Sequence, residues 1–532
     1  MSLYWWQTGI IYQVYPRSFQ DSNNDGIGDL RGIIRRLDYL KWLGIKALWL
    51  SPVCPSPMAD FGYDISDYKG IDPIFGTLDD FEELVREVHN RDLKIIMDFV
   101  PNHSSDQHPW FVESRSTLDN PKRDWYLWYD PLSDGSPPNN WLSVFGGSAW
   151  ELDKKTGQYY YHAFLKEQPD LNWRNPEVRE AMYDIMRFWL NKGIDGFRID
   201  VVWHLIKDKN LRDNPKNPNY EEHMATYDSL LPVYSTDQPE THDIVTEMRS
   251  IIDQYPEHLM IGEIYLPIQR LVTYYGTNGK GANLPFNFAL ISAPWEAQKI
   301  SSMIDEYESA LPGNAWPNWV IGNHDQPRIT SRVGLNQAKI AAILLLTLRG
   351  TPTMYYGDEI GMRDVPVPSS DIRDPQGLNM PDKNLSRDPS RTPMQWDNSE
   401  YAGFSQVKPW LPIDRHYHRV NIEREKNDFY SMLTFYRKLI DFRQKEITLM
   451  SGDYSPFHSD KQMIAYFRKK PEHSTFLIVL NLSHRPCYFK SKRVSLKGTI
   501  RFATSPELEG LPIDEEINLG GDEGIIIRVT ES

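Results

Sequence analysis

The sequence predicts an α/β fold: a (β/α)8 TIM barrel with a long insertion after its third strand and a C-terminal antiparallel β-domain. Short apolar runs alternate with helical patterns as far as about residue 450, and beyond Gly452 the helical pattern stops. Acidic residues stand at the carboxyl ends of several runs, where such barrels carry their chemistry. The eight predicted strands are Ile10–Val14, Ala47–Leu50, Lys94–Val100, Gly196–Asp200, Leu259–Glu263, Leu284–Phe288, Trp319–Gly322 and Thr353–Tyr356.

Helix signals separate several of these strands. Thr77 can cap a helix whose apolar stripe extends from Phe81 to Val88. Asn175, followed by proline, has the residue types of an N-cap and first helical position, and Gly193 can end that helix at the C′ position. Eight strands with intervening helices favour a closed barrel over an open doubly wound sheet.

Two long segments interrupt the alternation. Residues 103–172 are rich in Asp, Pro, Gly, Trp and Tyr, and a loop of this length is usually functional or a small domain of its own. Residues 362–427, after the eighth strand, are rich in Pro, Asp and Arg, and we expect them to lie over the active face. The predicted domains are the barrel at 1–102 and 173–450, the inserted domain at 103–172 and the β-domain at 451–532. Strands of the last domain are predicted at Met463–Arg468, Thr475–Asn481 and Gly524–Val529.

The composition is that of an ordinary soluble globular protein, with 40% hydrophobic and 25% charged residues. A net charge of −15 without a Lys/Arg cluster argues against nucleic-acid and anionic-membrane partners. The longest apolar run, Ile340–Leu348, is well short of the roughly 18 residues that a bilayer requires. The first residues lack the features of a signal peptide, and Cys54 and Cys487 are expected to be free thiols. We therefore expect a cytoplasmic protein, monomeric or weakly self-associating.

The most informative stretch is the strand end that carries Arg198 and Asp200. Period-2 alternation directs both side chains to the same side of the strand. A carboxylate beside a guanidinium stays ionised and can act as a nucleophile, although a structural ion pair would look the same in sequence. Glu263 and Asp325 stand at two further strand ends at nearly equal spacing. Three such ends favour a catalytic site over a structural pair.

A separate loop has the oxygen ligands that Ca²⁺ prefers. Its candidate ligands are Asp21, Asn23, Asp25, the backbone carbonyl of Ile27, and Asp29. The loop resembles only the first half of an EF-hand loop, since it lacks the glutamate at the twelfth position. The sequence predicts a structural Ca²⁺ site here, with Mg²⁺ as an alternative ion and a solvated acidic turn as the alternative without metal.

Two histidines are expected at the barrel mouth. His103 follows the third strand, and His324 stands beside Asp325. Imidazoles at such positions can donate hydrogen bonds to a polyol. No third His or Cys completes a zinc set, and no organic cofactor is expected.

These motifs carry a family resemblance. Asp98–His103, Gly196–Asp200, Glu263 and Asn323–Asp325 resemble the four ordered signature regions of the α-amylase superfamily, glycoside hydrolase family thirteen. Gln168–Asn172 resembles the fifth region, in the form typical of the oligo-1,6-glucosidase and α-glucosidase branch. The resemblance implies a catalytic barrel, an inserted domain B and a C-terminal β-sandwich.

The resemblance also implies catalytic roles. Asp200 corresponds to the nucleophile, Glu263 to the general acid/base, and Asp325 to the carboxylate that orients the sugar hydroxyls. Retaining hydrolysis uses two carboxyls about 5–5.5 Å apart, on either side of the scissile bond. Arg198 is expected to hold Asp200 ionised, while burial keeps Glu263 protonated.

The resemblance also implies residues that bind the substrate. His103 and His324 correspond to residues that hydrogen-bond the sugar hydroxyls. Tyr63 resembles the residue that stacks on the terminal glucose, and an Asp60–Arg387 pair would close the sugar site into a pocket. Phe145 and Phe164 are expected to complete its apolar wall, and Arg198 is grouped with these substrate-binding residues.

The resemblance implies an exo-acting, retaining α-glucosidase that releases α-linked glucose from the non-reducing ends of short oligosaccharides. Val201 after the nucleophile tends to accompany tolerance of α-1,6 linkages, but the bulky Trp203-His204 pair leaves the linkage open. A trehalose synthase or sucrose isomerase type of enzyme is the alternative, although the arginine-rich isomerase loop is missing. Non-catalytic heavy chains of amino-acid transporters share the barrel, but would carry a membrane-spanning segment and an eroded triad.

Overall fold

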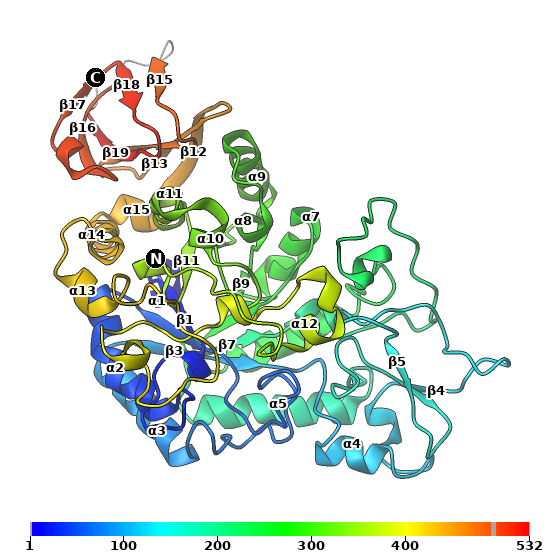
Figure 1. The fold of residues 1–532 in the computed structure, drawn as a ribbon. Coiled ribbons are helices and arrows are strands. Elements are labelled where there is room, and N and C mark those ends of the chain that lie inside the picture. The colour runs from blue at the N-terminus through cyan, green and yellow to red at the C-terminus, as the bar shows by residue number, and fades with distance from the viewer. Residues whose placement is uncertain (1–2, 491–495, 531–532) are drawn as a thin grey trace.

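The computed structural model describes residues 3–490 and 496–530. Its centre is an eight-stranded parallel sheet in the order β10-β11-β1-β2-β3-β7-β8-β9 (Figure 1). The strands are β1 (Ile11–Val14), β2 (Ala47–Leu50), β3 (Lys94–Phe99), β7 (Gly196–Ile199), β8 (Leu259–Gly262), β9 (Leu284–Pro285), β10 (Asn318–Val320) and β11 (Thr351–Tyr355). Neighbours in chain order lie side by side, as in a (β/α)8 barrel.

Side chains close the barrel between β9 and β10. The Asn287 amide donates to Oδ1 of Asn318 (2.9 Å), and Nδ2 of Asn318 donates to the Pro285 carbonyl (2.6 Å). The predicted strand Leu284–Phe288 is therefore wrong in length, because an asparagine side chain replaces the strand ladder after Pro285. The seventh and eighth strands begin one and two residues earlier than predicted.

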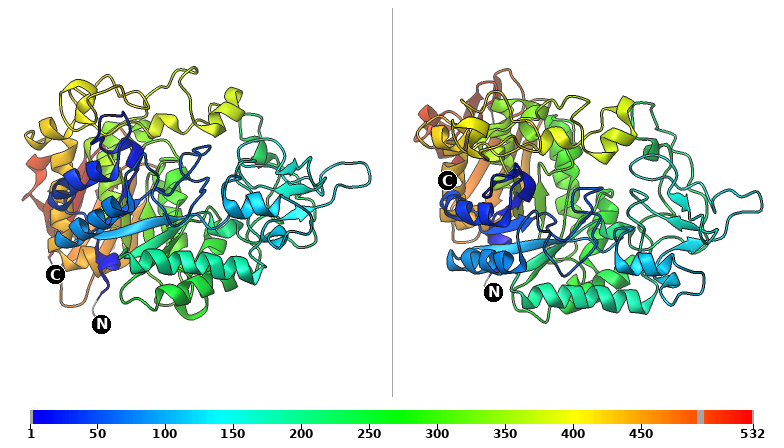
Figure 2. Two further views of the ribbon diagram at one scale, coloured as in Figure 1. Left: turned by 90° about the horizontal axis from the view of Figure 1, so that it is seen from below. Right: turned by 60° about the horizontal axis from the view of Figure 1, so that its bottom comes forward.

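Helices follow the strands and cover the outside of the barrel (Figures 1 and 2). The longer ones are α2 (Leu30–Leu43), α3 (Leu78–Asn90), α5 (Pro176–Asn191), α6 (Thr241–Ile252), α9 (Ala297–Ala310), α11 (Leu335–Thr347) and α14 (Met432–Lys445). Thr77 caps α3 through the Asp80 amide, and Gly193 follows α5 with a φ of +94°. Both predicted helix boundaries are confirmed. The apolar run of α11 is buried.

Short helices lie in the connections. They are α1 (Trp5–Thr8), α4 (Pro109–Ser114), α7 (Ile268–Leu271), α8 (Ala289–Ser292), α10 (Ile329–Val333), α12 (Pro375–Asn379), α13 (Ile422–Lys426) and α15 (Ile447–Ser451). Among the described residues, no helix is long and apolar enough to cross a membrane.

Two non-barrel segments approach the carboxyl ends of the strands. Residues 103–172 contain a small antiparallel sheet in the order β4-β6-β5, formed by β4 (Trp128–Tyr129), β6 (Tyr159–Tyr161) and β5 (Trp150–Leu152). They project to one side of the barrel, while residues 362–427, yellow in Figure 2, lie across its end. Side chains from both segments reach the site described below.

The C-terminal part folds into two antiparallel sheets with an apolar core between them. The larger has the order β12-β13-β14-β19-β16-β17 and the smaller pairs β15 with β18. Their bounds are β12 (Asp453–Ser459), β13 (Met463–Lys469), β14 (Thr475–Asn481), β15 (Cys487–Lys490), β16 (Lys497–Ala503), β17 (Pro512–Asp514), β18 (Glu516–Leu519) and β19 (Gly524–Val529). Cys54 and Cys487 are both free thiols.

Candidate active site

Three carboxylates from distant parts of the chain meet at the carboxyl ends of the barrel strands. Asp200 directly follows β7, Glu263 directly follows β8, and Asp325 lies in the loop after β10. All three line one cavity of about 540 Å³. Alternation along short parallel strands positions them, because the ends of neighbouring strands share one rim.

A single buried guanidinium joins the first two carboxylates. Arg198 donates through Nη1 to Asp98 (2.7 Å) and Asp200 (2.6 Å), and its Nη2 lies 2.7 Å from Oε2 of Glu263. The Arg198 side chain is only 1% exposed and does not line the cavity. Its grouping with substrate-binding residues is therefore not what the geometry supports: Arg198 positions the carboxylates from beneath.

Protonation in this cluster is shared. Burial raises the pKa of Asp200 and of Glu263, against the opposing charge of Arg198. Three buried carboxyls around one cation cannot all be ionised at moderate pH, so the cluster holds at least one proton. The expectation that Asp200 is ionised while Glu263 holds the proton stays a prediction, because burial raises the pKa of both carboxyls.

Asp325 is in a more cationic environment. Its Oδ1 accepts from Arg387 (3.1 Å) and Arg391 (2.9 Å), and His324 Nε2 lies 3.4 Å from Oδ2. Burial disfavours the charged form, but these contacts with His324, Arg387 and Arg391 outweigh burial and hold the pKa of Asp325 well below its usual value. Asp325 is therefore ionised.

Strained backbone helps to place Glu263. Val201, directly after Asp200, has φ +36° and ψ +45°, a left-handed conformation that a β-branched residue rarely adopts. Its amide donates to Oε2 of Glu263 (2.9 Å). Strain of this kind persists where surrounding contacts over-determine the backbone, and here it directs an amide at a functional carboxyl.

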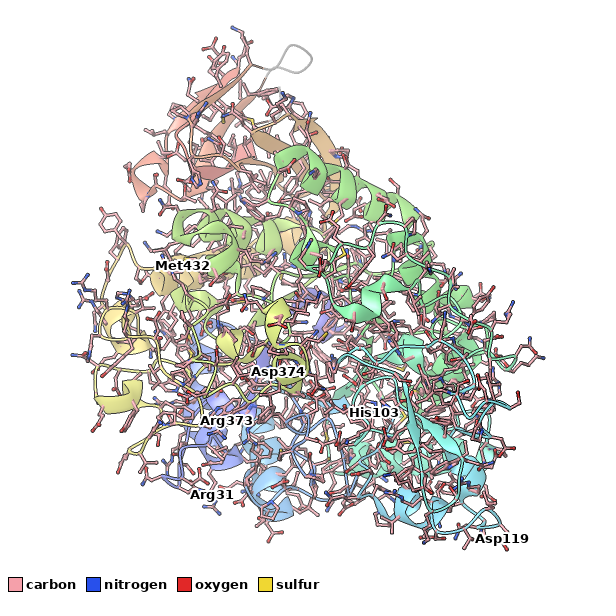
Figure 3. All side chains as sticks on the ribbon, turned by 45° about the vertical axis from the view of Figure 1, so that its right-hand side comes forward. Arg31, His103, Asp119, Arg373, Asp374 and Met432 are labelled. Atoms are coloured by element: carbon pink, nitrogen blue, oxygen red, sulfur yellow. The ribbon has the colours of Figure 1, made fainter. Side chains whose placement is uncertain are left out.

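An ion pair and two aromatic rings line part of the cavity. Arg387 Nη2 donates to Asp60 Oδ1 (2.7 Å), and the guanidinium lies over the Phe145 ring, 4.8 Å from its centroid. The Phe145 and Phe164 rings are 5.6 Å apart. These four residues, which we call the pocket wall, all line the cavity. Asp374, labelled in Figure 3, holds Arg387 by accepting hydrogen bonds from its Nε and Nη2 atoms.

The remaining predicted residues also line the cavity. Tyr63 stacks on His324 with ring centroids 5.5 Å apart, and its hydroxyl is 2.7 Å from Nε2 of that histidine. His103, at the start of the inserted segment (Figure 3), has Nε2 3.1 Å from the Tyr63 carbonyl. Burial lowers the pKa of both imidazoles to about 3, so they are neutral. A sugar hydroxyl could replace the Tyr63 hydroxyl or carbonyl as the hydrogen-bond partner of these imidazoles.

The sequence did not identify several residues of the site. Asp98 completes the carboxylate cluster, and Asp374 and Arg391 hold the charged groups around Asp325. Asp98 opens the signature region Asp98–His103, but no role of its own was predicted for it from the sequence. The cavity is also lined by Trp203, which was noted in the sequence, and by Tyr265, Leu266 and residues between Asn217 and Thr236, which were not.

The predicted cation loop lies apart from this cavity. Asp21 accepts hydrogen bonds from the amides of Asn23 and Gly26 and from the Ser405 hydroxyl, while Asp29 caps α2. The oxygen donors are of the type that Ca²⁺ prefers. Within residues 3–490 and 496–530, however, no three His, Cys, Asp or Glu side chains are gathered as a metal site. A cation here stays a prediction.

Comparisons with known proteins agree with this geometry. Residues 13–452 match the family described as alpha amylase, catalytic domain. An oligo-1,6-glucosidase of Parageobacillus thermoglucosidasius is 39% identical, with 92% of each chain covered. The amino acid transporter heavy chain SLC3A1 of Rattus norvegicus is 38% identical over 98% of this chain and 78% of its own.

Solved structures superpose over almost the whole chain. The alpha-glucosyl transfer enzyme XgtA is 35% identical with a TM-score of 0.93, covering 99% of this chain and 100% of its own. The trehalulose synthase MutB from Pseudomonas mesoacidophila MX-45 is 35% identical with a TM-score of 0.92, covering 100% of both chains. From its barrel, its carboxylates and a family match spanning residues 13–452, the chain belongs to the α-amylase family of glycoside hydrolases.

Proposed function

We propose that this chain is an exo-acting, retaining α-glucosidase that removes terminal non-reducing α-linked glucose from short oligosaccharides. One observation carries the proposal: Asp200 and Glu263 are held by the same guanidinium and line one cavity together with the Asp60–Arg387 ion pair. We infer that this nearly buried pair closes one end of the cavity. A closed end admits the last ring of a chain and no ring beyond it.

The proposed reaction has two steps at one anomeric carbon. A carboxylate oxygen of Asp200 attacks that carbon while Glu263 gives its proton to the departing glycosidic oxygen, which forms a β-glucosyl-enzyme ester. Glu263 then takes a proton from water, the water oxygen attacks the same carbon, and Asp200 leaves. Two inversions give net retention. Two carboxyls on adjacent nitrogens of Arg198 are compatible with the short separation of a retaining pair.

Asp325 and the pocket wall are proposed to bind the ring. The ionised Asp325 accepts hydrogen bonds from two sugar hydroxyls, and Asp60 and Arg387 bind the hydroxyl farthest from the anomeric carbon. Tyr63 provides the stacking face. Both charged groups of the wall are nearly buried, so they can discriminate strongly against a ring that leaves them unpaired.

Transfer or isomerisation is the second candidate. It is favoured by the whole-chain superposition on proteins described as an alpha-glucosyl transfer enzyme and a trehalulose synthase. All three reactions share the glucosyl-enzyme ester and differ in which nucleophile, water or a sugar hydroxyl, takes the glucosyl group. The cavity surface around Trp203 and Tyr265 would decide that choice.

Product analysis separates the candidates. Purified protein is incubated with maltose, isomaltose, kojibiose, nigerose, trehalose and sucrose, and products are followed by chromatography and by NMR of the released anomer. Release of α-glucose first supports the proposal. Conversion of sucrose mainly to isomeric disaccharides would assign the isomerase instead. Internal cleavage of starch, or β-glucose as the first product, would overturn it.

One variant distinguishes an enzyme from a non-catalytic binding protein. Asp200→Ala abolishes turnover in an enzyme, whereas a heavy-chain-like binding protein would have no turnover to lose. The cytoplasmic location and the monomeric or weakly associated state stay predictions from the sequence.

A further inference from the structure

A second cavity of about 430 Å³ lies on the other side of the pocket wall. Phe164 lines both cavities. At three other places, consecutive residues face the two spaces: Asp60, Phe145 and Gln376 line the first, and Ala59, Gly146 and Pro375 line the second. The two cavities are therefore separated by a single layer of residues.

His162 gives the second cavity a directed hydrogen-bonding group. The residue is only 5% exposed and lines the cavity, and its Nδ1 lies 2.9 Å from the Phe164 carbonyl. A carbonyl oxygen can only accept, so Nδ1 carries the proton. Burial lowers the pKa of His162 to about 4, so the ring is neutral and Nε2 presents a lone pair. Among the described residues Nε2 has no hydrogen-bond partner, so it can accept a hydrogen bond from a ligand.

The other lining residues define the class of ligand. Glu151, Glu167 and Lys166 contribute two negative charges and one positive charge, which disfavours phosphates and other anions. Asn379 and Ser148 add neutral polar groups at exposed positions, and Trp150 adds an aromatic ring. No cluster of metal-ligating side chains occurs here in the described chain. A neutral molecule with several hydroxyl donors fits this mixture of acceptors, amide and aromatic surface.

We propose that the second cavity is a binding site for one neutral hexose ring, with a ring hydroxyl donating to Nε2 of His162. The inference rests on the proposed function for the source of that ring. It is either glucose released in the adjacent pocket or the glucosyl end of a second oligosaccharide. A volume of about 430 Å³ accommodates one such ring with solvent around it. The proposed hexose would contact Phe164, which belongs to the pocket wall. The carbonyl of Phe164 accepts hydrogen bonds from His162 and Ser143.

Calorimetric titration tests the proposal. Glucose is titrated into the wild-type chain, His162→Ala and Asn379→Trp, where the last variant fills the rim from an exposed position. Asn379→Ala is the matched control, because it removes the amide without filling the cavity. We expect two binding events in the wild type and the control, and one in the other two variants, or a second event at least tenfold weaker. Turnover of p-nitrophenyl α-glucoside should stay within about twofold in the two Asn379 variants, which do not contact the pocket wall's Phe164 carbonyl.

Isomaltose on the inactive Asp200→Asn variant distinguishes the two sources. Two events with isomaltose identify an oligosaccharide end as ligand, whereas two with glucose and one with isomaltose identify free glucose. A single glucose event in the wild type, or two events retained in both His162→Ala and Asn379→Trp, would overturn the proposal. Since binding and turnover are measured separately, a protein that binds two glucose molecules but hydrolyses no α-glucoside would refute only the proposed function.

Discussion

Asp60→Asn tests the pocket wall without changing its shape. Asp60 is the one wall carboxylate that both faces the cavity and pairs with Arg387, at 2.7 Å. The substitution removes a charge and one charge-assisted acceptor, whose loss typically costs about 2–3 kcal/mol. At 1.4 kcal/mol per factor of ten, kcat/KM for maltose or isomaltose should fall roughly 30- to 150-fold.

The stability of Asp60→Asn should not fall with its activity. Burial raises the pKa of Asp60 to about 6, against the charge of Arg387. A carboxyl whose folded-state pKa is raised makes a contribution to stability that is present below its unfolded pKa, near 4, and is lost as pH rises through 6. Two pKa units correspond to about 3 kcal/mol, so Asp60→Asn should melt no lower than wild type at pH 7. The low-pH fall in wild-type kcat/KM, near pH 6, should move to lower pH in the variant.

Asp374→Asn is the matched control, because Asp374 also pairs with Arg387 but does not line the cavity. Its pKa is lowered: burial opposes ionisation, but Arg387 and Arg391 outweigh it. This variant should therefore lose stability and lose less activity than Asp60→Asn. Equal loss of kcat/KM in the two variants, or an unchanged value in Asp60→Asn, would refute the assignment of Asp60 to the sugar pocket.

Three further predictions concern the nucleophile, the cation loop and a buried carboxyl far from the site. Asp200→Asn should lower kcat by about 10⁴-fold or more at an unchanged melting temperature, and a loss below tenfold would contradict its role. Chelation of divalent cations should lower the melting temperature of the wild type, and added Ca²⁺ should restore it. The melting temperature of Asp21→Ala should respond to neither. An unchanged wild-type melting temperature with chelator and with Ca²⁺ would show that the loop holds no cation. Burial raises the pKa of Glu425 to about 8, so its contribution to stability is lost as pH rises from about 4.5 through 8, by at most about 1.4 kcal/mol per pH unit. In Glu425→Gln, the free energy of unfolding should fall less steeply with pH between about 4.5 and 8 than in the wild type. An identical slope in both proteins would show that Glu425 does not titrate in this range.

Local patterns were sufficient for the barrel and its carboxylates. Alternation placed Arg198 and Asp200 on one side of β7, and strand ends identified Glu263 and Asp325. The structure brings all of them to one rim, because parallel strands of a closed barrel end at the same side. Period and strand polarity are properties of neighbouring residues, so they can be read without knowing the fold.

Other features depended on contacts between residues distant in the chain. Burial of Asp200 raises its pKa, although the adjacent arginine alone indicated the opposite. Asp374 and Arg391 reach the site from residues 362–427, and Asn318 closes the barrel through a side chain that no strand pattern encodes.

The sequence by itself determined the barrel, the order of its acidic strand ends and the family. Only the tertiary structure decided that one guanidinium holds both catalytic carboxyls, that Asp374 and Arg391 hold the charged groups around Asp325, and that a second cavity lies behind the pocket wall. The physical reason is the distance along the sequence over which each feature is set. Strand and helix periodicity depend on residues a few positions apart. Burial of charged groups, ion-pair networks and cavities arise where segments hundreds of residues apart pack together.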